Sequence, residues 1–186
     1  MFLKEGKIER YLKDLKSNLN QQELSIENFK IYPGSLEAKI LPDFSTLAAK
    51  NFKVGEHWGG ENTVNYFKTT VTLPADWDQN QGNIYLEIIP GASHPGGLSG
   101  TESLLYLNGR ALQGLDRKHS LVLLGEKELA QARQNGDPTE LEIVIKAFSG
   151  LEAAEQQFKK AALIYRDRNL EDFYRLALTL KESIEI

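Results

Sequence analysis

Hydrophobic and polar positions alternate with a period of two over much of the middle of the chain. In residues 63–73, Phe67, Val71 and Leu73 fall on one face and Lys68 falls on the other. Because successive side chains of a strand point to opposite faces, this pattern predicts a strand with one buried face. Similar or wholly apolar short runs predict further strands at residues 84–89, 104–107, 121–124, 141–146 and 161–165.

Near both ends of the chain the apolar spacing becomes helical. Helices are predicted over residues 4–20, 126–133 and 167–186. In the first of these, Ile8, Leu12 and Leu15 recur at intervals of three and four, with charged residues between them. In the last, Asn169 is predicted to be the N-cap.

Turn residues separate the predicted elements. Asn108-Gly109 supplies the two positive-φ positions of a tight type I′ hairpin turn. Residues 90–100 are rich in glycine and proline, which predicts one long loop. Residues 21–50 are weakly patterned, and residues 31–34 are typical of a turn.

Short strands with turns between them, and helices mainly at the ends, favour a mainly β fold. We expect an antiparallel β-sandwich or jelly roll with flanking N- and C-terminal helices. We divide the chain into an N-terminal helix at residues 1–22, a β-sandwich domain at 23–166 and a C-terminal helix at 167–186. A chain of 186 residues is long enough for one domain with its own core.

Composition and charge argue against several classes of partner. The net charge is −4, and the 22 lysines and arginines are spread along the chain, which disfavours a nucleic-acid partner. No apolar run approaches the roughly 20 residues that span a bilayer, and the N-terminus lacks the apolar region of a signal peptide. Without cysteine there are no disulfides, catalytic thiols or thiolate metal sites. We therefore expect a cytoplasmic protein without a membrane partner.

Four side chains are candidates for carbohydrate binding or interdomain contact. Trp58, which follows His57 between glycines, either stacks on a pyranose or closes the core as a lid. Asp116 and His119 either bind sugar hydroxyls or form a structural corner in which the aspartate accepts backbone N–H groups. Glu102, after the glycine-rich loop, either reaches a neighbouring active site or is a surface carboxylate. Asp116 and His119 alone are too few ligands for a metal site, so we expect none.

Four sequence blocks that occur in order carry a family resemblance. They are Gly55-Glu-His-Trp-Gly-Gly60, the strand at 67–73 with Pro74-Ala-Asp-Trp77, Gly100-Thr-Glu-Ser-Leu-Leu-Tyr-Leu-Asn-Gly109, and Gln113-Gly-Leu-Asp-Arg-Lys-His119. Together they resemble the N-terminal region of glycoside hydrolase family 38 α-mannosidases of the cytosolic type. The resemblance implies a galactose-binding-like β-sandwich that precedes a catalytic domain. It also implies zinc-assisted retaining hydrolysis of α-mannosides, with an aspartate nucleophile, by the full-length enzyme.

The sequence departs from this family in the residues that hold the catalytic zinc. The family pattern includes a His-x-Asp pair, and none of His57, His94 and His119 is followed two residues later by aspartate. No catalytic residue is therefore carried onto this chain, and we expect it to end where the catalytic domain begins. Zinc is expected in the full-length enzyme, and no cofactor is expected in this chain.

Three functions remain open. The first is a non-catalytic accessory domain of an α-mannosidase, whose partners are the catalytic domain of the same polypeptide and the α-mannoside substrate. The second is a carbohydrate-binding module that recognises mannosides through Trp58, Asp116 and His119. The third is an oligomerisation scaffold, in which apolar helix faces at Leu12 or Leu176 join copies of the parent enzyme into a homo-oligomer.

Overall fold

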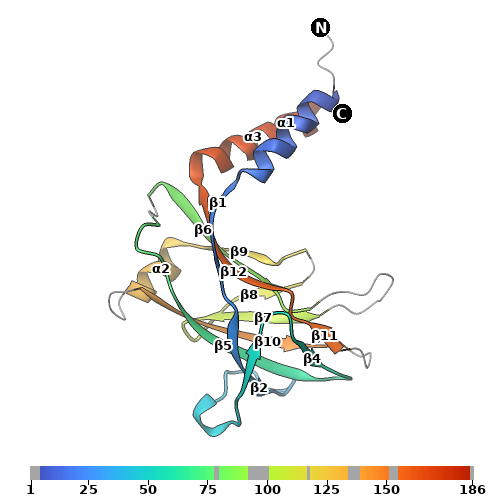
Figure 1. Cartoon of the computed structure of the whole chain (residues 1–186), viewed down its shortest axis with the longest axis vertical. Coiled ribbons are helices and arrows are strands. Elements are labelled where there is room, and N and C mark those ends of the chain that lie inside the picture. The colour runs from blue at the N-terminus through green and yellow to red at the C-terminus, as the bar shows by residue number, and fades with distance from the viewer. Residues whose placement is uncertain are drawn as a thin grey trace.

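The computed structural model describes residues 5–77, 80–91, 101–116, 118–133, 139–150 and 155–184. Figure 1 shows strands in the body of the molecule and two long helices that project from it. The helices are α1 (Glu5–Ser17), α2 (Glu126–Arg133) and α3 (Arg168–Ile184), with a short 3₁₀ helix, η1 (Phe44–Thr46). The strands are β1 (Asn20–Ser25), β2 (Asn28–Pro33), β3 (Lys50–Lys53), β4 (His57–Gly59), β5 (Val64–Thr72), β6 (Gly82–Ile89), β7 (Glu102–Leu107), β8 (Arg110–Leu115), β9 (Leu121–Leu124), β10 (Glu140–Phe148), β11 (Glu155–Gln157) and β12 (Lys160–Asp167).

The described strands pair antiparallel in three sheets. A four-stranded sheet has the order β1-β12-β6-β9, a six-stranded sheet has the order β3-β2-β5-β10-β7-β8, and β11 pairs with β4. Side chains from both larger sheets meet in one core, which includes Leu86 and Leu163 from the first and Phe67 and Ile145 from the second. The predicted antiparallel β-sandwich with flanking helices is confirmed.

Phe67 lies at the centre of an aromatic cluster in this core. Its ring contacts those of Phe29, Phe52, Trp58 and Phe158, with centroid distances from 4.9 to 6.5 Å. Phe67 itself is fully buried. The alternation over residues 63–73 thus does place this side chain on the core face of β5.

Residues 21–50 contain strands that the hydrophobic pattern did not predict. β1 has the polar sequence NQQELS and exposes nearly all of its side chains. It has no buried face to stabilise it, and it is held as a strand by its backbone pairing with β12. The predicted turn at residues 31–34 is wrong, because β2 continues along β5 as far as Pro33, opposite Asn65. Pro33 lies beyond Ile31, the last residue of β2 that pairs with β3, and such an edge position tolerates a missing N–H.

The predicted hairpin is confirmed. Asn108 and Gly109 have φ values of 48° and 76°, which is the left-handed conformation that a type I′ turn requires. Backbone N of Asn108 donates to the carbonyl oxygen of Glu142, and Asn108 Oδ1 accepts from Glu142 N, both at 2.9 Å. These bonds fix the turn between β7 and β8 to the neighbouring strand β10.

The helices α1 and α3 lie side by side and form a two-helix arm that projects from the sandwich (Figure 1). Asp167, and not Asn169 as predicted, caps α3, because Asp167 Oδ1 accepts a hydrogen bond from Leu170 N at 2.8 Å. Lys181 Nζ of α3 donates to Glu9 Oε1 of α1 at 3.3 Å. In the described part of the chain, no helix has both the length and the apolar character that a membrane span needs.

Candidate functional site

One end of the sandwich, which we call the loop end, carries Glu102, Asp116 and His119. β7 begins there with Glu102, and residues 92–100 of the predicted glycine-rich loop lie outside the described residues. Ser103 pairs with Leu115, so Glu102 and Asp116 occupy the next positions along two paired strands. In Figure 1 this end lies at the right, and β12 runs from it to the arm.

Trp58 belongs to the core and not to the surface. It is 4% exposed, packs edge to face on Phe67, and donates from Nε1 to the carbonyl oxygen of Pro90 at 2.5 Å. Gly59 has a φ of +91°, and a Cβ there would lie 2.6 Å from the Cβ of Ser149. Because the indole is buried and bonded to Pro90, it holds the start of the glycine-rich segment, as a lid residue does, and offers no face for stacking on a sugar.

A buried polar network lies beneath the loop end. Thr101 Oγ1 donates to Gln156 Oε1 at 3.1 Å, and Gln156 Nε2 donates to the carbonyl oxygen of Ser149 at 3.2 Å. Ser149 Oγ donates to the carbonyl oxygen of Thr63 at 3.1 Å. These residues come from four separate segments, so no local motif in the sequence indicated the network. It gives the loop end a hydrogen-bonded base.

Asp116 and His119 form an exposed corner. Asp116 Oδ1 accepts from the backbone N atoms of Lys118 and His119 at 2.7 and 2.9 Å, and His119 Nδ1 lies 2.8 Å from Asp116 Oδ2. The hydrogen bond from the His119 ring, followed by that from Lys118 N, lowers the pKa of the Asp116 carboxyl. The Asx-turn geometry is present, and sugar binding at this exposed pair stays a prediction.

The Asp116–His119 corner does not fit zinc. It offers one carboxylate and one imidazole, whereas zinc in proteins takes at least three side-chain ligands. Within the described ranges, no group of three His, Cys, Asp or Glu side chains is arranged to hold a metal ion.

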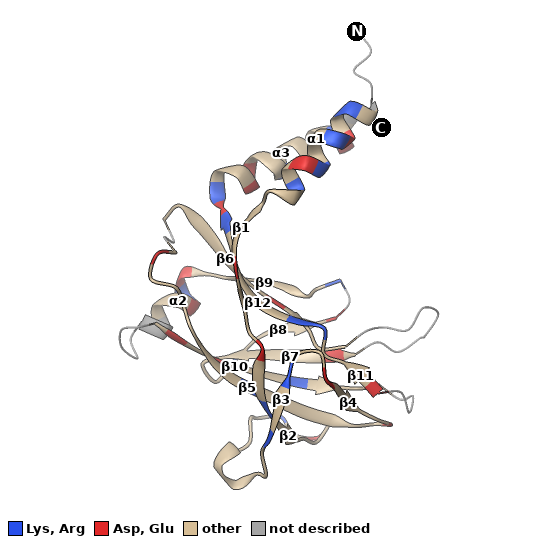
Figure 2. Ribbon diagram, viewed as in Figure 1, with Lys and Arg blue, Asp and Glu red and all other residues tan. Residues whose placement is uncertain are grey.

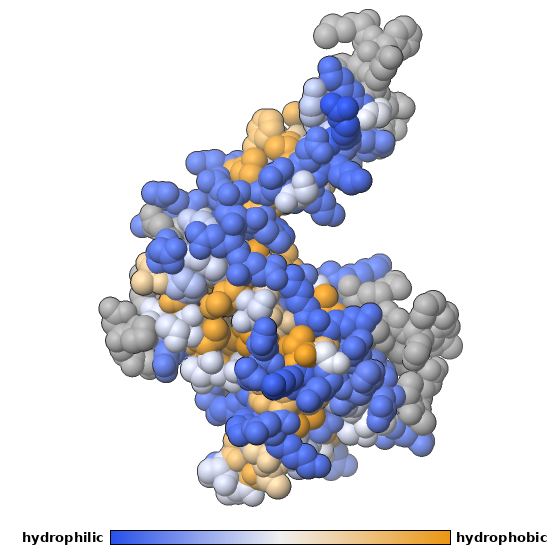
Figure 3. Space-filling view, in the orientation of Figure 1, coloured by the Kyte–Doolittle hydropathy of each residue, from blue (hydrophilic) through white to orange (hydrophobic). Residues whose placement is uncertain are grey.

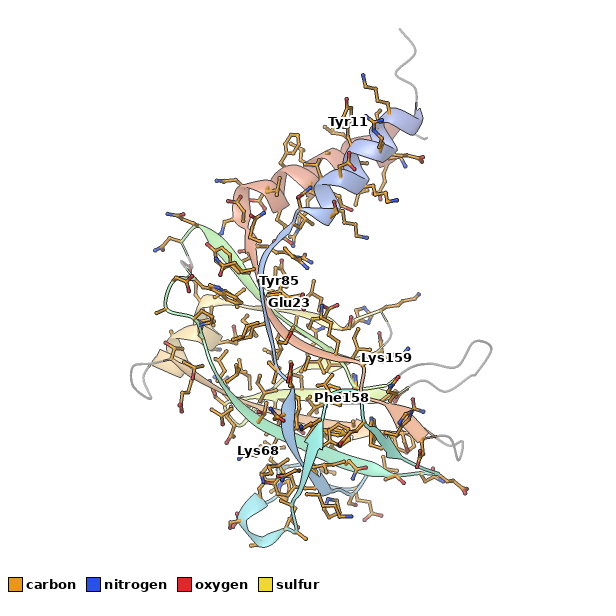
Figure 4. The ribbon with its side chains drawn as sticks, viewed as in Figure 1. Tyr11, Glu23, Lys68, Tyr85, Phe158 and Lys159 are labelled. Atoms are coloured by element: carbon orange, nitrogen blue, oxygen red, sulfur yellow. The ribbon has the colours of Figure 1, made fainter. Side chains whose placement is uncertain are left out.

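A second cluster, which we call the Glu171 cluster, lies at the base of the arm. The Glu171 carboxylate is 2% exposed and accepts hydrogen bonds from Asn83 Nδ2 at 2.9 Å and from the Tyr85 hydroxyl at 2.8 Å. The guanidinium groups of Arg166 and Arg175 each lie 3.2 Å from Glu171 Oε1. The cluster therefore connects α3 with β6 and β12. Figure 4 labels Tyr85, where the arm meets the sandwich.

The surroundings of Glu171 favour its ionised form. Burial raises the pKa of this carboxyl, but hydrogen bonds from Asn83, Tyr85 and Arg166 and the charge of Arg175 outweigh burial, so the pKa is lowered. Burial, and then the hydrogen bond to Glu171, raises the pKa of Tyr85 to about 12. Tyr85 is therefore a neutral donor at physiological pH.

The arm exposes an apolar face, visible as orange side chains in Figure 3. Tyr11, Phe173, Leu176 and Leu180 are 50–58% exposed. A hollow of about 550 Å³ on the arm is lined by Ile8, Tyr11, Leu12, Asp14, Leu15, Asn18, Phe173 and Ala177. Leu12 itself is only 8% exposed, so of the two leucines predicted at an interface, Leu176 is the accessible one.

Comparisons with known proteins agree with this architecture. No protein-family model matches the chain. Its sequence is similar to that of α-mannosidase G from Dictyostelium discoideum, with 26% identity over 146 residues, 75% of this chain. The chain spans 12% of the length of that relative.

Among solved structures, the chain is similar to the β-glucuronidase from Ruminococcus gnavus. The TM-score is 0.51 at 13% identity, with 80% of this chain and 29% of that chain covered. Against the complex of that enzyme with N1-substituted uronic isofagomine, the TM-score is 0.50 and the coverage is 80% and 30%. At this identity the similarity concerns the fold alone.

The fold defines a β-sandwich domain of the kind found in glycosidases. The sequence match is more specific, because over 146 residues the chain is similar to a region of an α-mannosidase.

Proposed function

We propose that the chain is the N-terminal accessory domain of an α-mannosidase, and that it packs on the catalytic domain of the same polypeptide without catalysing hydrolysis itself. The observation that supports this most is a mannosidase match confined to 12% of the relative's length. On this proposal, zinc and the α-mannoside substrate belong to the full-length enzyme, which works in the cytoplasm.

Two surfaces are suited to packing on a catalytic domain. The apolar face of the arm leaves Phe173 and Leu176 largely in water, and covering such side chains is favourable. At the loop end, Trp58 and Gln156 form a fixed base, and the exposed Glu102 would lie against the catalytic domain. Both surfaces belong to one domain, so together they would fix its orientation.

An activity assay tests the proposal. The 186-residue chain and the product of the complete open reading frame that encodes it are incubated with p-nitrophenyl α-mannoside and zinc. We expect turnover by the complete product and none by the chain alone, because none of the three histidines of this chain stands in the His-x-Asp pattern of the family's zinc site. Turnover by the chain alone, or a complete product without mannosidase activity, would contradict the proposal.

An oligomerisation scaffold is a second candidate function, favoured by the exposed face of the arm. If this face joins copies, the isolated chain associates as its concentration rises, and Leu176→Ser weakens the association because this leucine is 58% exposed. Sedimentation velocity over a concentration series measures this. Leu123→Ser is the matched control, since Leu123 is 49% exposed on β9, outside the arm. A monomer at every concentration would exclude the scaffold.

A further inference from the structure

A hollow of about 530 Å³ lies on the six-stranded sheet, where β3, β2 and β5 run side by side. Its lining includes three lysines and two asparagines: Lys30, Lys53, Lys68, Asn28 and Asn51. Figure 2 shows the blue of basic residues on these strands, and Figure 4 labels Lys68. The hollow is separate from the loop end and from the arm, and its volume is in the range of small-molecule sites.

The strand register brings positive charges together in this hollow. Lys30 of β2 is directly opposite Lys68 of β5, and Lys53 of β3 is directly opposite Asn28 of β2. Directly opposed residues of antiparallel strands lie on the same face of the sheet, where like charges destabilise the pairing. Lysines on edge strands deter unwanted pairing, which accounts for Lys53, but β2 and β5 are inner strands. Edge protection therefore does not explain Lys30 and Lys68.

Acidic groups neutralise only part of this charge. Lys68 Nζ pairs with Glu142 Oε2 at 2.6 Å and lies 4.9 Å from the centroid of the Phe44 ring. Lys30 Nζ donates to the neutral Asn51 Oδ1 at 2.5 Å. Among the residues that the structure describes, no carboxylate forms an ion pair with Lys30 or Lys53. Neither ammonium group therefore has an ion-pair partner among the described residues, although the Glu56 carboxylate lies near Lys53 and accepts a hydrogen bond from its backbone N at 2.9 Å.

We propose that this hollow binds an oxyanion, the phosphate or sulfate group of a sugar ester. Ammonium groups form strong charge-assisted hydrogen bonds with such oxygens, and the asparagine amides add neutral donors. An anion between Lys30 and Lys68 also removes their repulsion. The anion site rests on the hollow alone, whereas the assignment of a sugar as its carrier rests on the proposed function.

Calorimetric titration of the 186-residue chain with inorganic phosphate, mannose 6-phosphate and mannose, at constant ionic strength, tests this proposal. We expect both phosphates to bind, mannose 6-phosphate more tightly, and mannose not to bind. Lys30→Gln is expected to weaken phosphate binding about tenfold. The same variant should raise the unfolding temperature of the ligand-free chain, because it removes one of two opposed charges. A lysine with a purely structural role would not give both effects.

Lys50→Gln is the matched control, because Lys50 lies on β3 but not in the lining of the hollow. It makes the same change in net charge and should leave phosphate binding unchanged. Equal phosphate affinity in Lys30→Gln and the unmodified chain, or equal weakening in both variants, would overturn the site. Binding of phosphate without preference for the sugar ester would overturn the sugar assignment only. The α-mannoside assay judges the proposed function independently of these results.

Discussion

Replacing Phe67 with alanine is expected to lower the free energy of unfolding of the domain by about 4 kcal/mol. The side chain is fully buried, and its ring contacts those of Phe29, Phe52, Trp58 and Phe158. Truncation removes buried apolar surface and leaves a cavity among four rings from different segments, which cannot all move inward together. Urea denaturation followed by tryptophan fluorescence measures the change, because Trp58 reports on this cluster.

Phe173→Ala removes the same atoms from an exposed position and is the control. Phe173 is 58% exposed on the arm, so its truncation should change the free energy of unfolding by less than about 1 kcal/mol. A similar loss in both variants would contradict the assignment of Phe67 to the centre of the core. A small loss in both would mean that the aromatic cluster closes around the missing ring.

The sequence pattern predicted the strands whose faces differ in polarity and missed those held by pairing alone. β5 and β10 alternate visibly because one face of each meets the core and the other carries Lys68 or Glu142. β1 has almost no buried side chain, and its backbone hydrogen bonds to β12 are long-range contacts that no local pattern contains. Likewise, Pro33 indicated a turn locally, but the register with β5 extended the strand through it.

The sequence could predict only those parts of the candidate site that are formed by residues close together in the chain. Asp116 and His119 are three positions apart and do form the corner that their side chains indicated. The glycines around Trp58 made it a candidate, but they did not show whether the indole stacks on a sugar or closes the core. Its contacts are Pro90 and Phe67, which are distant in the sequence, so only the structure places it in the core. Hydrogen bonds in the Glu171 cluster join residues up to 90 positions apart, and the sequence pattern did not indicate this cluster.

Glu171→Ala is expected to loosen the arm, raising the hydrogen-exchange rate of α3 amides about a hundredfold while β5 amides keep their protection. Removal of the buried carboxylate leaves the Tyr85 hydroxyl and Asn83 Nδ2 without their acceptor, and Arg166 without its counter-charge. Breaking a buried pair in this way costs about 3 kcal/mol. The cost falls on α3, because the cluster is where this helix contacts β6 and β12.

Asp172→Ala is the control, since it removes a carboxylate from the next position of α3, where the side chain is exposed, and should change exchange little.

The effect of Glu171→Ala should also depend on pH. Because folding lowers the pKa of Glu171, its contribution is present above the ordinary carboxyl value of 4.5 and is lost as the pH falls through the lowered value. The variant and the unmodified chain should therefore converge in acid. At the alkaline end, the contribution of Tyr85 should fade as the pH rises from 10 through about 12, its pKa in the folded chain. A loss of α3 protection that stayed constant over the whole pH range would show that the Glu171 side chain acts by packing, and not by its charge.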